Sequence, residues 1–382
     1  MYVSMLAAVG RHKTIRVALG VLVGHELPLY NIVRKDLMKA LLKLFNRGVV
    51  ALLLVPSAFA GLVIVPTFDS SITSNANASQ IESAINTATS TLETLYSNSV
   101  TIPVTFTYEA LANGDLLDNN TDEYYSISYS SYVSLLKAHS AANPNNTALA
   151  LALANLGSGN DASGTANLAI NGNQLLMLGI TGDPGDSVIN INSTQPFSFS
   201  RPVGSGDYDA IGGIEHELDE VLGVGGGAST LNECLDGKTF FCGKYGSTDL
   251  YRYSAPGIPS FTTSSSATSY FSINGGVTQI VQANQNSSGD FADFAPRCGT
   301  GSGTLELIQN ASNCTGQYEA YTGSSPEFTM MEAVGWDPTA AALATPEPSP
   351  FVLLAIGFIL CIWLLRRQRG LLRRLDERGA LG

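Results

Sequence analysis

Positive charge is confined almost entirely to the two ends of this chain, and this asymmetry restricts what the middle can be. From 61 to 345 the sequence holds six Lys or Arg residues against 27 Asp or Glu residues. A stretch this acidic repels nucleic acid and anionic lipid, so nucleic acid is excluded as a partner. With 382 residues and 45% hydrophobic content, the chain can bury one or two cores of ordinary domain size.

The basic cluster near the N-terminus belongs to a segment that predicts export. Basic residues precede an apolar run over 49–55, and Ala58 and Ala60 hold the small-residue positions of a cleavage site. We expect 38–60 to be a signal peptide, read by the Sec export machinery and removed by signal peptidase. Residues 1–37 are then a misannotated upstream extension. A buried core helix is the alternative, which the flanking residues disfavour.

The C-terminal end carries a second signal. A Pro-rich linker over 341–350 contains the motif Pro346, Glu347 and Pro348, and an apolar segment over 351–365 follows it. This order predicts a folded domain, a linker and a single transmembrane segment.

A basic tail over 366–382 completes this arrangement and predicts a cytoplasmic C-terminus with the main domain outside. Together these features resemble the PEP-CTERM sorting class of Gram-negative bacteria. The resemblance implies recognition by an exosortase-like enzyme and an extracytoplasmic location in the cell envelope, either as a single-pass membrane protein or released after tail processing. A plain membrane anchor is the alternative.

Four cysteines in the acidic region agree with export: Cys234, Cys242, Cys298 and Cys314. An even set in an oxidising compartment favours disulfides. Pairing of neighbours, Cys234 with Cys242 and Cys298 with Cys314, is preferred among three connectivities. A cysteine metal site is the rival interpretation, but no C-x-x-C spacing occurs.

The region between the two signals predicts an α+β fold. An N-terminal α/β subdomain over 61–223 is followed by an irregular, β-rich subdomain over 224–340 that is rich in Gly and Ser. Asn274 and Gly275 predict a hairpin turn in the second subdomain. Apolar periodicity in the first predicts strands at 62–65 and 100–108, helices at 80–96, 130–139 and 146–156, and an extended edge segment at 188–199.

The residues that carry chemistry lie on a predicted helix over 209–223. Its apolar residues gather on one face, while His216 and Glu220 point away from that face. Two side chains at i and i+4 can hold one metal ion, and Glu217 can then take a proton from metal-bound water. Because Glu220 replaces the second histidine of H-E-x-x-H, Zn²⁺ is the expected cofactor but another divalent metal stays open.

Residues 62–337 resemble a family of predicted secreted bacterial metalloproteases with an H-E-x-x-E active helix. The matching stretches are 62–72, 216–223, 249–257, 270–276 and 334–337. The resemblance implies a zincin-like (metzincin-like) fold, with His216 and Glu220 as metal ligands and Glu217 as the general base.

The third ligand is open. Residue 226, where metzincins have a third histidine, is glycine. Asp249 is the candidate, because zincins can draw a third ligand from downstream of the helix, and Tyr251 and Tyr253 are alternatives. His139 is expected to have a packing or surface role.

Two alternatives accompany this site. The acidic residues of the helix could form a solvated face, with His216 an ordinary surface residue. Asp290 and Asp293 could bind Ca²⁺, although a polar turn accounts for them with fewer assumptions.

The sequence therefore predicts an exported metal-dependent endopeptidase that acts on peptides or proteins, with Glu217 activating metal-bound water. The alternative is a non-catalytic envelope or biofilm matrix protein on a degenerate zincin-like scaffold, sorted by an exosortase system.

Overall fold

The computed structural model describes residues 61–343, except 113, 120–122, 157–166, 182–184, 232–244, 288, 299–306 and 319. The elements up to residue 221 are β1 (Val63–Phe68), α2 (Ser70–Thr73), α3 (Ala78–Leu95), β2 (Thr101–Glu109), β3 (Leu117–Asn119), β4 (Tyr124–Ser128), α4 (Tyr129–Ala142), α5 (Thr147–Asn155), β5 (Asn167–Asn171), α6 (Gly172–Met177), β6 (Ser187–Asn192), β7 (Phe197–Ser198), β8 (Tyr208–Asp209) and α7 (Ala210–Val221). The later elements are the 3₁₀ turns η1 (Gly226–Ala228) and η2 (Thr248–Tyr251), β9 (Arg252–Ala255), β10 (Ile258–Pro259), β11 (Tyr270–Phe271), β12 (Val281–Gln282), α8 (Pro326–Ala333) and α9 (Ala340–Leu343).

The largest described sheet has the strand order β1-β2-β6-β3. Strands β1, β2 and β6 are parallel, and β3 pairs antiparallel with β6. The predicted strands at 62–65 and 100–108 are confirmed as β1 and β2. Every second side chain of β2 (Ile102, Val104, Phe106) is buried, as expected for a strand with one face toward the core. The prediction of an edge segment at 188–199 was wrong, since β6 lies inside the sheet and most of its side chains are buried.

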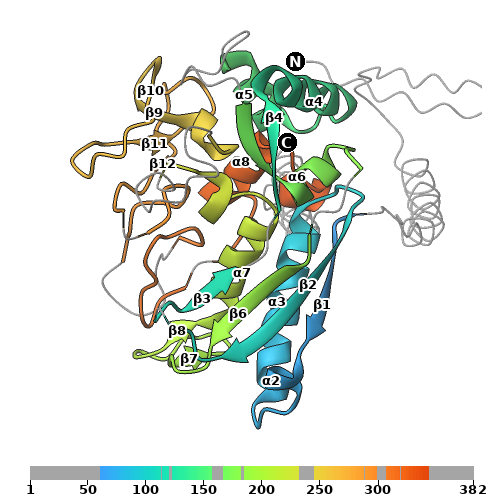
Figure 1. Ribbon diagram of the computed structural model, residues 1–382, viewed down its shortest axis with the longest axis vertical. Coiled ribbons are helices and arrows are strands. Elements are labelled where there is room, and N and C mark those ends of the chain that lie inside the picture. Colours follow the sequence, from blue (N-terminus) through green and yellow to red (C-terminus); the bar gives the residue numbers. More distant parts are fainter. Residues whose placement is uncertain are drawn as a thin grey trace, which may run out of the picture. The chain divides into compact units, whose positions relative to one another are not determined.

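Helices α3 and α7 contact each other and the same sheet (Figure 1). Helix α3 buries Ile81, Ile85 and Leu92 at helical spacing, and its other side is rich in exposed Ser and Thr. The helices predicted at 80–96, 130–139 and 146–156 are confirmed as α3, α4 and α5. Helix α7 thus lies between α3 and the later chain, which places its residues in the interior.

The later residues form a small antiparallel sheet, β10-β9-β11-β12, and share one apolar core with the first part of the chain. Phe271, Phe294 and Trp336 join this core beside residues of α3 and α7. The hairpin predicted at Asn274 and Gly275 is correct in its antiparallel pairing, but β11 and β12 are joined by the longer connection 272–280. Both Gly275 and Gly276 have positive φ there, so the turn occupies more than two residues.

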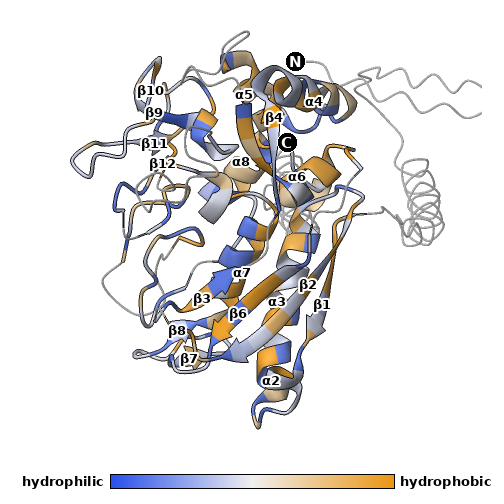
Figure 2. Cartoon of the chain, in the orientation of Figure 1, coloured by the Kyte–Doolittle hydropathy of each residue, from blue (hydrophilic) through white to orange (hydrophobic). Residues whose placement is uncertain are grey.

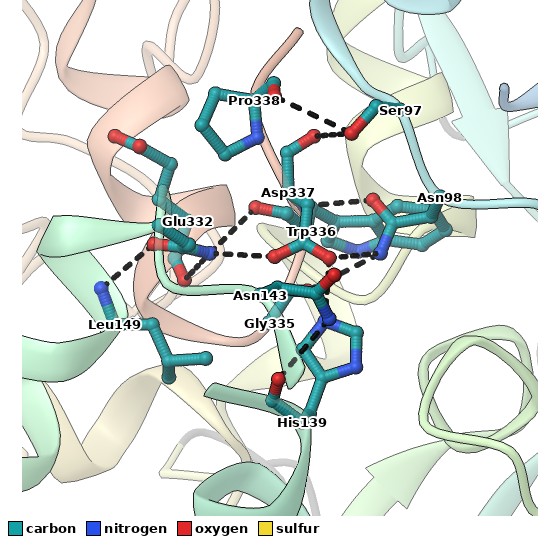
Figure 3. A network of polar contacts seen from close by, with 11 residues as sticks. Ser97, Asn98, His139, Asn143, Leu149, Glu332, Gly335, Trp336, Asp337 and Pro338 are labelled. Atoms are coloured by element: carbon teal, nitrogen blue, oxygen red, sulfur yellow. Dashed lines mark hydrogen bonds and ion pairs between the residues drawn. The ribbon is translucent and has the colours of Figure 1, made fainter. Parts of the chain in front are cut away.

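A polar network around Asp337 fastens this late part of the chain to α4, to the N-cap of α5 and to the loop after α3 (Figure 3). His139 Nε2 of α4 lies 2.8 Å from Asp337 Oδ2, and the Asp337 backbone N–H donates to Asn98 Oδ1 at 2.7 Å. Asn146, which caps α5, donates from Nδ2 to the carbonyl of Trp336 at 3.0 Å. His139 therefore contributes to packing, as expected, and lies in this network.

The predicted fold class needs one correction. Across the described ranges, no helix has both the length and the apolar character needed to cross a bilayer, so the predicted single C-terminal transmembrane segment has no support. The fold class is corrected to a mixed α+β domain. The segment proposed as the span, 351–365, lies outside the described residues, as do the signal peptide and the Pro346 motif.

The predicted disulfide between Cys298 and Cys314 is confirmed, with Cα atoms 5.7 Å apart. The second predicted pair, Cys234 and Cys242, lies outside the described residues.

Candidate metal centre

Helix α7 begins and ends where its sequence predicts. The Asp209 side chain caps the first turn by accepting from the Gly212 N–H at 3.1 Å, and Arg201 donates to the same carboxylate at 2.7 Å. The helix stops before Gly223, which has φ +93°, a conformation that glycine adopts without strain. Between these two ends the helical geometry fixes the angular positions of the five residues from His216 to Glu220.

The acidic residues of α7 are buried, although Figure 2 shows them as a hydrophilic stretch of the helix. Glu215, Glu217, Asp219 and Glu220 are 1%, 7%, 0% and 8% exposed. The alternative of a solvated acidic face is therefore wrong. Buried carboxylates are costly unless they are protonated, hydrogen-bonded or bound to a cation, so this burial calls for a chemical reason.

Three side chains converge on one point of this helix. His216 Nε2 lies 3.2 Å from Glu220 Oε1 and 3.8 Å from Asp293 Oδ2. One ligand atom from each of the three residues lies within 4.8 Å of the other two, so this group could hold a metal ion. Imidazole and carboxylate groups at these separations are the ligands that divalent metals take in catalytic sites.

The imidazole of His216 is oriented by a segment inside the loop that the Cys298–Cys314 disulfide closes. Its Nδ1 lies 2.8 Å from the carbonyl oxygen of Ile308, and Gln309 Nε2 donates to the His216 carbonyl at 3.0 Å. When Nδ1 carries the proton and donates to Ile308, the lone pair of Nε2 faces Glu220 and Asp293. Metal-binding histidines are commonly held in this way.

Around His216, three buried carboxyl groups (Glu217, Glu220 and Asp293) share one imidazole, so their negative charge is not balanced without a cation. Burial raises the pKa of Glu217 well above its usual range, and the neighbouring Glu220 carboxylate raises it further. Burial also raises the pKa of Asp293. Burial alone would lower the pKa of His216, but the carboxylates of Asp293 and Glu220 outweigh it and raise that pKa well above its usual range. A divalent cation would satisfy the same carboxylates, so the donor set fits a metal.

Asp293 occupies the place for which Asp249 was predicted. Asp249 is fully buried, and its oxygens accept from Ser229 Oγ at 2.6 Å and from the Gly246 N–H at 2.9 Å. The structure does not bring Asp249 to the group, and the hydroxyl of Tyr251 donates to the Ala333 carbonyl instead. Asp293 is one of the two residues, with Asp290, that were considered as Ca²⁺ ligands from the sequence.

The glycine at residue 226 contacts the metal group directly. Its N–H donates to Asp293 Oδ1 at 3.3 Å, and a Cβ at this position would lie 2.6 Å from Glu220 Cδ. The position that holds the third histidine in metzincins is therefore filled by backbone, and the carboxylates of Glu220 and Asp293 occupy the space beside it.

Comparison with protein-family models, with curated proteins and with solved structures found no match. The chemistry of the centre therefore rests on its own residues.

Proposed function

We propose that this chain is an exported metal-dependent endopeptidase, with His216, Glu220 and Asp293 as metal ligands and Glu217 as the general base. The convergence of the three ligand atoms within 4.8 Å of one another supports this proposal. Zn²⁺ is the proposed metal, although a set with two carboxylates and one imidazole selects it less strictly than two histidines would.

A divalent metal held by these residues would polarise a peptide carbonyl and make a water molecule more acidic. Glu217 adjoins His216 in sequence and is buried. A bound divalent cation would favour its ionised form, and the carboxylate could then accept a proton from the attacking water and later donate it to the leaving amine. His216 is held by Ile308 and keeps its Nε2 toward the carboxylates during this exchange.

An extracytoplasmic location is part of the same proposal. A disulfide between Cys298 and Cys314 is typical of proteins that fold in an oxidising compartment. We propose export by the Sec machinery, removal of the signal peptide after Ala60, and recognition of the Pro346 motif by an exosortase-like enzyme. The substrates would then be peptides or proteins outside the cytoplasm.

The test measures metal content and casein hydrolysis on the same full-length preparations. Wild type should contain one metal per chain and lose activity with a chelator. Glu217→Gln should keep the metal and lose about 10²–10⁴-fold in rate, as expected for removal of a general base. His216→Ala should lose the metal. Wild type without stoichiometric metal would contradict the proposal and favour the non-catalytic envelope protein.

A further inference from the structure

Asp293 is held in place by a folded loop. The backbone N–H of Asn284 donates to the Asp293 carbonyl at 2.8 Å, and Asn284 Nδ2 donates to the Asp290 carbonyl at 2.9 Å. Just beyond these residues, Ala283 and Phe294 form a β-bridge. These contacts join residues 283–284 to residues 290–294 and form the base of the loop. The base determines where the Asp293 carboxylate lies.

Arg252, the first residue of β9, binds both sides of this base. Its side chain is buried, with the residue 3% exposed. Nη2 donates to the Asn284 carbonyl at 3.2 Å and to Gln285 Oε1, and Nη1 donates to the Phe291 carbonyl. The guanidinium also lies 5.7 Å from the centre of the Phe291 ring. A planar fork with several donors can hold two backbone segments at a fixed separation, which a lysine cannot do.

Asp249, three residues earlier, favours the charged form of Arg252. Burial lowers the pKa of Arg252, and the Asp249 carboxylate opposes that effect. Asp249 also accepts from Ser229 and from the N–H of Thr230, which lie shortly after the Gly226 turn. Asp249 and Arg252, in the stretch where a third ligand was predicted, therefore bind the residues after Gly226 and the base of the Asp293 loop.

We propose that Arg252 is a positioning residue of the metal centre: it fixes the Asp290–Phe294 turn and thereby holds Asp293 at the distance from His216 that completes the ligand set. This inference rests on the proposed metal site. In the simpler account, Arg252 and Asp249 only stabilise the core. The two accounts differ in what happens to metal binding when the fold is retained.

The test uses full-length protein, stripped of metal and titrated with Co²⁺, whose visible absorption reports the number and geometry of ligands. Arg252→Lys keeps the charge but cannot bind both sides of the loop. We expect its dissociation constant for Co²⁺ to rise about 10–100-fold, the range found when residues that support metal ligands are changed. The cobalt absorption bands should also weaken.

Asn98→Ala is the matched control, because it removes buried hydrogen bonds in the Asp337 network and leaves the loop intact. It should unfold at a lower temperature but bind Co²⁺ as wild type does. The rise in unfolding temperature caused by Co²⁺, measured for each variant against its own metal-free form, separates metal affinity from general destabilisation. If Arg252→Lys does not fold, Gln285→Leu removes one acceptor of the same guanidinium and should show a smaller loss of the same kind.

Asp293→Asn distinguishes the two levels of the proposal. If Asp293→Asn loses Co²⁺ while Arg252→Lys, or Gln285→Leu in its place, binds it like wild type, the role of Arg252 is overturned and the metal centre stands. If Asp293→Asn binds Co²⁺ like wild type, the proposed ligand set itself is wrong.

Discussion

At the scale of single residues, Gly226 shows how closely backbone approaches the metal group. Its φ is +40°, and an added Cβ would lie 2.6 Å from both Cδ and Oε1 of Glu220. A methyl group there can be accommodated only if the Glu220 carboxylate moves away from His216. The glycine therefore determines where the Glu220 carboxylate lies.

We predict that Gly226→Ala weakens metal binding about tenfold or more. The backbone strain should also lower the free energy of unfolding by about 1 kcal/mol. Gly257→Ala is the control, because Gly257 also has positive φ, at +72°, but its added Cβ would meet no atom within 4 Å. Isothermal titration with Zn²⁺ would check this, and equal affinities in the two variants would contradict it.

Residue spacing explains why part of the centre was predictable from the sequence. His216, Glu217 and Glu220 lie on one turn of a helix with clear capping and periodicity, so their proximity follows from local geometry. Asp293 lies in an irregular region far along the chain, where no period relates it to the helix. Asp249 and Asp293 were both plausible acids, and only tertiary contacts separate them, because one binds backbone groups and the other faces His216.

At the scale of elements, the segment closed by the Cys298–Cys314 disulfide contacts the metal group. Reduction of this disulfide would therefore loosen a segment that holds His216. Ile308 and Gln309 lie between Cys298 and Cys314, and both contact His216. Gln309 is anchored further by its N–H, which donates to Glu327 Oε1 of α8 at 3.0 Å. The covalent link thus restricts the segment that orients the His216 imidazole.

We predict that replacing both Cys298 and Cys314 by serine lowers the free energy of unfolding by about 3 kcal/mol, the value for a closed loop of this size. Metal affinity should also fall, since Ile308 would hold His216 less firmly. Urea unfolding and Zn²⁺ titration would measure the two effects, with the single variants as controls for loss of either side chain. Unchanged metal affinity in the double variant would show that α8 alone orients the segment.

The buried state of the acidic helix face was not predictable from the helix itself. Periodicity placed Ile214, Leu218 and Val221 on an apolar face correctly, and all three are buried. Much of the opposite face is covered by chain from beyond residue 245, where Asp293, Ile308 and Tyr321 contact His216 and Asp219, and this part of the fold has few regular elements. The α/β part of the fold was therefore anticipated in outline, whereas the irregular part, which completes the site, was not.

At the scale of the whole molecule, buried carboxyl groups determine how stability depends on pH. Burial, followed by the charge of Asp337, raises the pKa of Glu332 to about 7. In the folded protein this group keeps its proton at pH values where the unfolded chain has lost it. Its contribution is therefore fully present below its ordinary pKa and is lost as the pH rises through about 7.

We predict that the metal-free protein is less stable to urea at pH 8 than at pH 5.5, and that Glu332→Gln reduces this difference by being more stable than wild type at pH 8. Glu82→Gln on α3 is the control for replacing a carboxyl group by an amide elsewhere in the fold. Urea midpoints at the two pH values would measure both variants. A pH difference that persists fully in Glu332→Gln would assign it to other groups.

The indole N–H of Trp336 donates to the carbonyl of Leu222 at 3.0 Å, at the point where α7 ends. One of the last described segments of the chain thus closes the helix that carries His216, while Asp293 and Ile308 come from the segments just before it. A nascent or partly exported chain holds the H-E-x-x-E helix but neither its third ligand nor its anchor. The proposed endopeptidase would then acquire its full set of metal ligands only late in synthesis and folding.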